Sequence, residues 1–66
     1  MDRMKIAQRL RELRGDRTRL EVAEAIGIQQ SAIANYENGD RVPTDELKIK
    51  LAEYYGVPVG TLFFDP

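Results

Sequence analysis

Apolar residues recur along this chain with the period of an α-helix. In the first twenty residues the recurring positions are four and three residues apart, as on one face of a helix from about Arg3 to Arg14. They are Ile6, Leu10 and Leu13. Gly15 and Asp16 follow as a stop signal, so the pattern predicts that the first helix ends at this point.

A second helix is predicted to begin after Thr18, because Glu21 stands three residues later at the spacing of a capping box. Its inward stripe is Val22, Ala23 and Ile26. Gly27 is expected to end this helix in the left-handed conformation that glycine adopts at little cost. Ile28 then fills the core across the turn.

The third helix is expected from about Gln30 to Glu37, with Ile33 and Tyr36 facing inward and Asn38-Gly39 as a strong stop. A fourth helix opens at Pro43 or Thr44 and carries an inward stripe at intervals of four residues before Gly56. This stripe is Leu47, Leu51 and Tyr55.

A short fifth helix from about Val59 to Phe63 completes the prediction. The predicted fold is therefore all-α, a compact bundle of five helices that forms a single domain over residues 1–66.

Composition narrows the function. The 66 residues include no cysteine and no histidine, which removes disulfides, thiolate metal sites and the usual general base, so we expect neither an enzyme nor a metal protein. No apolar run approaches the roughly 20 residues that span a bilayer, and we expect a cytoplasmic protein. The net charge of −1 is unevenly distributed, because residues 1–20 hold seven Lys/Arg against three Asp/Glu. This basic end can still bind phosphates.

The spaced positions of the second and third helices resemble the helix-turn-helix of lambdoid repressor and Cro-like (XRE-type) regulators. The matching positions are Val22, Ala23, Ile26, Gly27, Ile28, Ile33, Tyr36 and the closing YENG. The later RVPTDELKIKLAEYYGVPVGTLF is similar to that family's fourth and fifth helices. The resemblance implies a transcriptional regulator that binds a palindromic operator in double-stranded DNA as a homodimer, with no cofactor or small-molecule ligand. In this pattern the small Ala23 lets two helices cross closely, and Gly27 makes the turn.

The resemblance places the third helix in the major groove, with its base-contacting positions at Gln30, Ser31, Ala34 and Asn35. Their spacing agrees, because these residues share the face opposite Ile33. Gln30 and Asn35 carry amides that can pair with adenine. From spacing alone, the same face could also be a solvated surface, although the spacing favours the DNA-contacting interpretation.

Contacts to DNA phosphates are expected around this helix, from Thr18, Arg19, Gln29, Asn38 and Arg41. Relatives usually have a glutamine at the position of Arg19, so an arginine adds charge there. In relatives an arginine late in the first helix pairs with the glutamate of the YENG segment, which implies a structural pair between Arg14 and Glu37.

Two positions depart from the family pattern. Arg17 replaces an apolar residue before the N-cap of the second helix, which removes an expected hydrophobic staple. Lys48 falls where an apolar residue is common, and its neighbours Leu47 and Ile49 could take over that role, which leaves the facing of the fourth helix open by one position.

The end of the chain offers a second surface. One of the adjacent rings Phe63 and Phe64 is expected to close the core and the other to form a dimer interface with Val59, unless both rings fold back on the first helix. A different class of function would use this Phe-rich end and the acidic fourth helix to bind a protein, as an antitoxin-like module or co-regulator. The steep salt dependence of DNA binding would distinguish the two.

Overall fold

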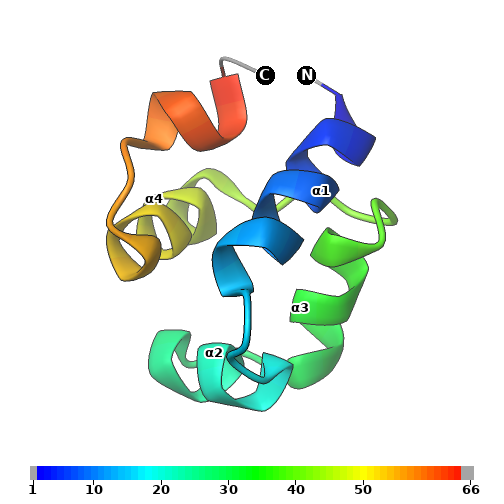
Figure 1. The fold of residues 1–66 in the computed structure, drawn as a ribbon, viewed down its shortest axis with the longest axis vertical. Helices are drawn as coiled ribbons and strands as arrows, with labels where there is room; N and C mark the ends of the chain where they lie inside the picture. The colour runs from blue at the N-terminus through cyan, green and yellow to red at the C-terminus, as the bar shows by residue number, and fades with distance from the viewer. Residues whose placement is uncertain (1, 65–66) are drawn as a thin grey trace.

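The computed structural model describes residues 2–64, apart from the side chain of Phe64, and this part of the chain contains helices and no strand. The four α-helices are α1 (Arg3–Arg14), α2 (Arg19–Ile26), α3 (Gln30–Glu37) and α4 (Asp45–Tyr55). A π-helical segment, η1 (Gly60–Phe64), follows them (Figure 1). The predicted all-α fold is confirmed, and the predicted bounds of α1 and α3 agree with the observed ones.

The helix starts are fixed by side chains that cover free backbone amides. The Asp2 carboxylate accepts from the N–H of Met4 at 2.9 Å at the start of α1. The Thr18 hydroxyl accepts from Glu21 N–H at 3.1 Å at the start of α2. Thr44 caps α4 in the same way, so α4 begins at Asp45 rather than at Pro43. Each cap stabilises its helix by about 1 kcal/mol.

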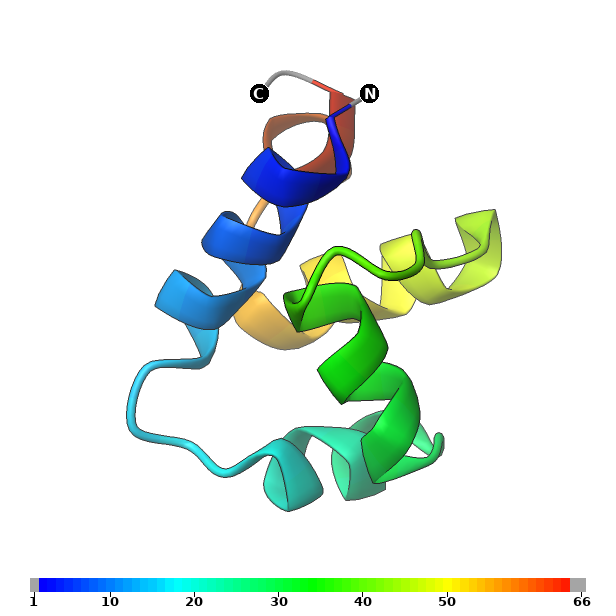
Figure 2. The ribbon, with the colours of Figure 1, turned by 90° about the vertical axis from the view of Figure 1, so that its right-hand side faces the viewer.

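The apolar stripes of all the helices meet in one core. α3 packs against both α1 and α2, while α2 also contacts α4 and α1 contacts η1 (Figure 2). The buried core is formed by Ile6, Leu10, Val22, Ala23, Ile26, Ile33, Tyr36, Leu51, Ala52, Leu62 and Phe63. Leu13 and Ile28 pack against its edge.

The facing of α4 is set by Lys48 rather than by its neighbour Ile49. Lys48 is 6% exposed and Leu47 packs against the core, whereas Ile49 is 52% exposed and does not share the inward role. The Lys48 ammonium lies 3.5 Å from the Asp45 carboxylate and 5.9 Å from the centre of the Phe63 ring. The aliphatic part of the lysine side chain can be buried at this position while its ammonium group contacts the carboxylate and the ring.

Arg17, at the position of the missing hydrophobic staple, contacts two aromatic rings of α4. Its guanidinium lies 5.3 Å from the centre of the Tyr54 ring and 5.8 Å from that of Tyr55. These cation–π contacts tie the connection between α1 and α2 to the end of α4. Among residues 2–64, no helix is long and apolar enough to cross a membrane.

Candidate nucleic-acid interface

α2 and α3 form a helix-turn-helix. Gly27 ends α2 at φ 84° and ψ 35°, the left-handed conformation predicted for it. The N–H groups of Gly27 and Ile28 both donate to the carbonyl of Ala23, at 2.8 and 3.0 Å, and close the helix end. Ala23 itself is 1% exposed, in agreement with its predicted place in the core. The turn therefore sets the direction in which α3 leaves α2.

α3 is anchored through one face only. Ile33 and Tyr36 are buried in the core, as predicted. On the other side, Gln30 and Ser31 are exposed, while Ala34 and Asn35 are half-buried. α3 forms the right-hand margin of the molecule in Figure 1 and lies toward the viewer in Figure 2. The four residues predicted to contact bases thus lie on a single helix at the edge of the molecule, and none is buried in the core.

The N-terminal turn of α3 has open donors. Gln29 occupies the N-cap position, but its side chain makes no capping hydrogen bond. The Ala32 N–H donates to the Gln29 carbonyl at 3.0 Å, and within the described residues the N–H groups of Gln30 and Ser31 have no protein acceptor. The positive end of the helix dipole lies at the same turn. Gln29 is exposed beside them, and its contact with a phosphate stays a prediction.

The loop after α3 is tied to the end of that helix. The N–H groups of Asp40 and Arg41 donate to the carbonyl of Asn35, at 2.9 and 3.3 Å. Asn38 and Arg41 are exposed. Both predicted phosphate-contacting residues of this loop are thus on the surface, together with the acidic Asp40.

A buried carboxylate lies where α1, α2 and α3 meet. The Glu37 side chain is 1% exposed and accepts from Arg14 Nε at 2.7 Å through Oε2. The geometry of the predicted Arg14–Glu37 pair is therefore present. This hydrogen bond raises the pKa of Arg14 above its ordinary value. Burial and, secondly, the Glu37 charge raise the pKa of the nearby Tyr55 to about 12.

Sequence reasoning missed two further contacts of Glu37. Arg19 Nε donates to Oε1 of the same carboxylate at 3.0 Å, and Arg11 Nη1 donates to the Glu37 carbonyl. Arg19, expected only as a phosphate contact, is therefore also part of the protein's internal ion pairs. The arginine at the first position of α2 is the sequence signal that could have indicated this pairing.

At the C-terminal end, one of two adjacent rings was expected to close the core and the other to take part in a dimer interface. Phe63 is 0% exposed and belongs to the core, so it is not available for a dimer interface. Val59 is half-buried, and the Phe64 side chain lies outside the described part of the structure. Phe63 is therefore the ring that closes the core.

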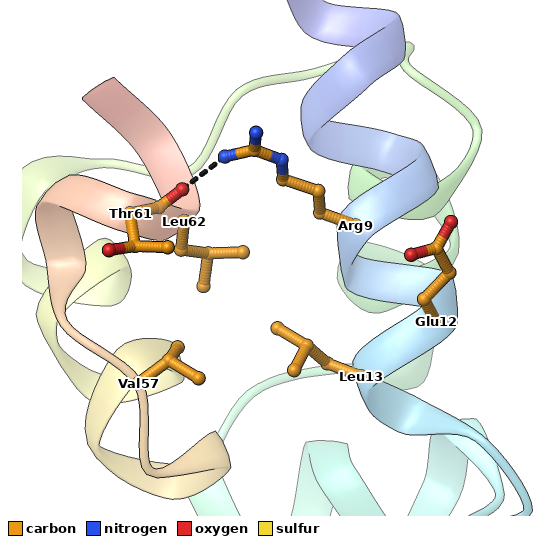
Figure 3. A pocket seen from close by; sticks show the side chains of 6 residues that line it. All are labelled: Arg9, Glu12, Leu13, Val57, Thr61 and Leu62. Carbon is orange, nitrogen blue, oxygen red and sulfur yellow. Dashed lines mark hydrogen bonds between the residues drawn. The ribbon is translucent and has the colours of Figure 1, made fainter. Parts of the chain in front are cut away.

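A separate pocket lies on the side of α1 away from α3. It measures about 240 Å³ and is lined by Arg9, Glu12, Leu13, Val57, Thr61 and Leu62. Figure 3 shows Arg9 reaching across it to donate to the carbonyl of Thr61. The pocket thus lies between α1 and η1 and does not touch the outer face of α3. Within the described residues, no group of His, Cys, Asp or Glu side chains could hold a metal ion.

Comparisons with known proteins agree with this geometry. A family model described as helix-turn-helix matches residues 8–62. The cryptic phage CTXphi transcriptional repressor RstR of Vibrio cholerae is 38% identical over 61 residues, which cover 89% of this chain. The same alignment covers 55% of that repressor, so the chain spans about half the length of this relative. No solved structure matches.

Proposed function

The chain belongs to the helix-turn-helix family of repressor and Cro-like regulators, and from this premise we propose that it is a transcriptional regulator that binds double-stranded DNA. The observation that carries the proposal is the outer face of α3. It presents amide and hydroxyl groups from a helix whose opposite face is fixed in the core. An α-helix of this kind fits the width of the major groove.

Direct base contacts are assigned to this face. The Gln30 amide can pair with N6 and N7 of adenine, and Asn35 can do the same if its half-buried side chain reaches the groove floor. Ser31 accepts several bases, while Ala34 offers a methyl group to thymine. A good bidentate contact discriminates between bases by about 1–3 kcal/mol.

Contacts to the DNA backbone are assigned to the rim of the same surface. They involve Thr18, Arg19, Gln29, Asn38 and Arg41. These groups fix the orientation of α3 without reading sequence. The exposed Thr18 hydroxyl uses its oxygen as a cap acceptor, and its own hydrogen remains available for a phosphate oxygen.

We further propose that two copies bind a palindromic operator. Dimeric helix-turn-helix proteins place their recognition helices about 34 Å apart, one turn of DNA. Val59 and Phe64 are the residues proposed for the contact between the two copies. Phe63 is left out of this contact because it is buried in the core. The name of the similar phage protein supports repression as the mode of regulation.

The proposal is tested by selecting duplexes from a random library with the purified chain. We expect a two-fold symmetric motif, and we expect Gln30→Ala to lose selection at one position in each half-site. Gln8→Ala removes an exposed glutamine from α1 and is the matched control, with the motif unchanged. If the wild-type protein enriches no motif, DNA reading by this chain is wrong. If Gln30→Ala keeps the full motif, the assignment of Gln30 is wrong.

A further inference from the structure

Two arginines from different helices converge on one carboxylate. Arg14 of α1 and Arg19 of α2 donate through Nε to the two oxygens of Glu37, at 2.7 and 3.0 Å. A third arginine, Arg11, binds the main-chain carbonyl of the same residue. Three guanidinium groups against one carboxylate leave a formal charge of +2 at this point. The partial negative charge that the helix dipole places at the C-terminal end of α3 offsets only part of this positive charge.

The two side-chain partners of Glu37 are held differently. Arg14 uses two nitrogens on the protein, because its Nη1 also donates to the carbonyl of Arg17 at 2.7 Å. Among the described residues, Arg19 is held through Nε alone. The Nη groups of Arg19 therefore lie outside its ion pair, and its side chain is 32% exposed against 1% for Glu37. The excess charge is thus accessible at Arg19.

The surroundings of Arg19 favour an anion. It is the first residue of α2, where the helix dipole is positive and the exposed Thr18 hydroxyl lies one residue before it. A guanidinium presents its N–H groups in one plane, so fixing Nε also fixes the direction in which the Nη groups point. An oxyanion such as a phosphate diester matches this fork of donors.

We propose that Glu37 positions Arg19 as a clamp for a DNA phosphate. The carboxylate holds the guanidinium plane through Nε, and the Nη groups bind the phosphate that lies at the start of α2. Pre-ordering the long side chain in the free protein reduces the entropy lost on binding. This inference rests on the proposed function and adds to it a positioning role for Glu37 and a fixed geometry for Arg19.

The test is the salt dependence of duplex binding, measured by fluorescence anisotropy over a series of salt concentrations. Arg19→Gln is expected to weaken binding by about 10-fold or more, since hydrogen bonds to charged groups contribute about 1.5–3 kcal/mol. It is also expected to make the logarithmic salt slope shallower by about 0.9, the value for one phosphate. Lys50→Gln removes one positive charge from the exposed side of α4, outside the basic segment 1–20, and is the control, with the slope unchanged.

Arg19→Lys separates charge from geometry. Lysine keeps the charge but lacks the planar fork, so we expect it to restore most of the salt slope and only part of the affinity. Arg14→Gln removes the other partner of Glu37; we expect it to lower the thermal midpoint while the folded protein keeps the wild-type slope. Circular dichroism of every variant confirms that the folded state is being measured.

The outcomes separate this inference from the proposed function. If the wild-type chain shows no salt-dependent duplex binding, the proposed function is wrong. If the wild-type chain binds and a folded Arg19→Gln protein keeps its affinity and slope, Arg19 has only an internal role and the clamp is wrong. If Arg19→Lys binds as tightly as the wild type, the charge alone is sufficient and positioning by Glu37 is wrong.

Discussion

Replacing Glu37 by alanine perturbs the point at which three helices are joined. The substitution leaves Arg14 and Arg19 beside each other without their common counter-ion. Losing one partner of a buried ion pair typically costs about 3–5 kcal/mol. Both arginines are partly exposed, at 21% and 32%, so they can reach water and the lower end of this range applies. We therefore expect Glu37→Ala to reduce the free energy of unfolding by about 3 kcal/mol.

A loss of this size is large for so short a chain. At about 0.05–0.15 kcal/mol per residue, 66 residues have a total stability of roughly 3–10 kcal/mol. In a domain of this size each kcal/mol shifts the thermal midpoint by about 4–8 °C, so the expected decrease is about 12–24 °C. Thermal unfolding followed by circular dichroism measures this shift.

Glu24→Ala is the control for the loss of a carboxylate, because Glu24 is exposed on α2. Surface substitutions of this kind usually stay within about 0.5 kcal/mol. If the midpoints of Glu37→Ala and Glu24→Ala are equal, the buried carboxylate does not brace the helices and this reasoning is refuted.

Three further predictions concern the local structure. Gly27→Ala should lower the free energy of unfolding by about 1–2 kcal/mol. The left-handed backbone alone is the cause, since an added Cβ meets no atom within 4 Å. Gly60→Ala is the control, because Gly60 has equal space and no positive φ and should change the urea midpoint little; equal midpoints for the two variants would contradict the argument. In the same assay, Thr18→Ala should lower the free energy of unfolding by about 1 kcal/mol, because it removes the hydroxyl that caps α2. Thr18→Ser keeps a hydroxyl and should retain the wild-type stability. An equal loss in both variants would exclude the hydroxyl as the cause. Tyr55 has a folded-state pKa raised to about 12 from 10, so the unfolded chain releases its proton first and stability should fall between pH 10 and 12. Tyr55→Phe should lose less stability over this interval, and a loss equal to that of the wild type would disprove the linkage.

The helix ends were predictable because they are encoded locally. The hydrogen bond from the Glu21 N–H to the Thr18 hydroxyl fixes the start of α2 within one turn, and Gly27 fixes its end through a backbone conformation that depends on a single residue. The inward face of α3 was equally accessible, since Ile33 and Tyr36 are the large apolar residues at helical spacing in that segment. The residues of the outer face of α3 could then be identified as those that do not belong to its inward face.

The contacts that the sequence did not reveal are those between helices. Arg19 and Glu37 are 18 residues apart, and no local pattern relates them. The facing of α4 depended on whether Lys48 or the neighbouring Ile49 is buried, and the contact of Lys48 with Phe63 joins residues too far apart in sequence for a local pattern to reveal it. The last segment spans five residues, too few to display a period, so a π-helical turn could not be distinguished from an α-helical one.

The two ends of α3 have different roles in this arrangement. At its C-terminal end, Glu37 is held by α1 and α2, and the Asn35 carbonyl is held by the following loop. At its N-terminal end, Gln29 provides no side-chain cap and Gln30 is exposed. The ion pairs at one end and the turn at Gly27 before the other end both fix the orientation of the helix, without a side-chain cap from Gln29. The N–H groups of Gln30 and Ser31 can therefore remain available to DNA, and a change in the residues that read bases there should alter specificity with little effect on the fold.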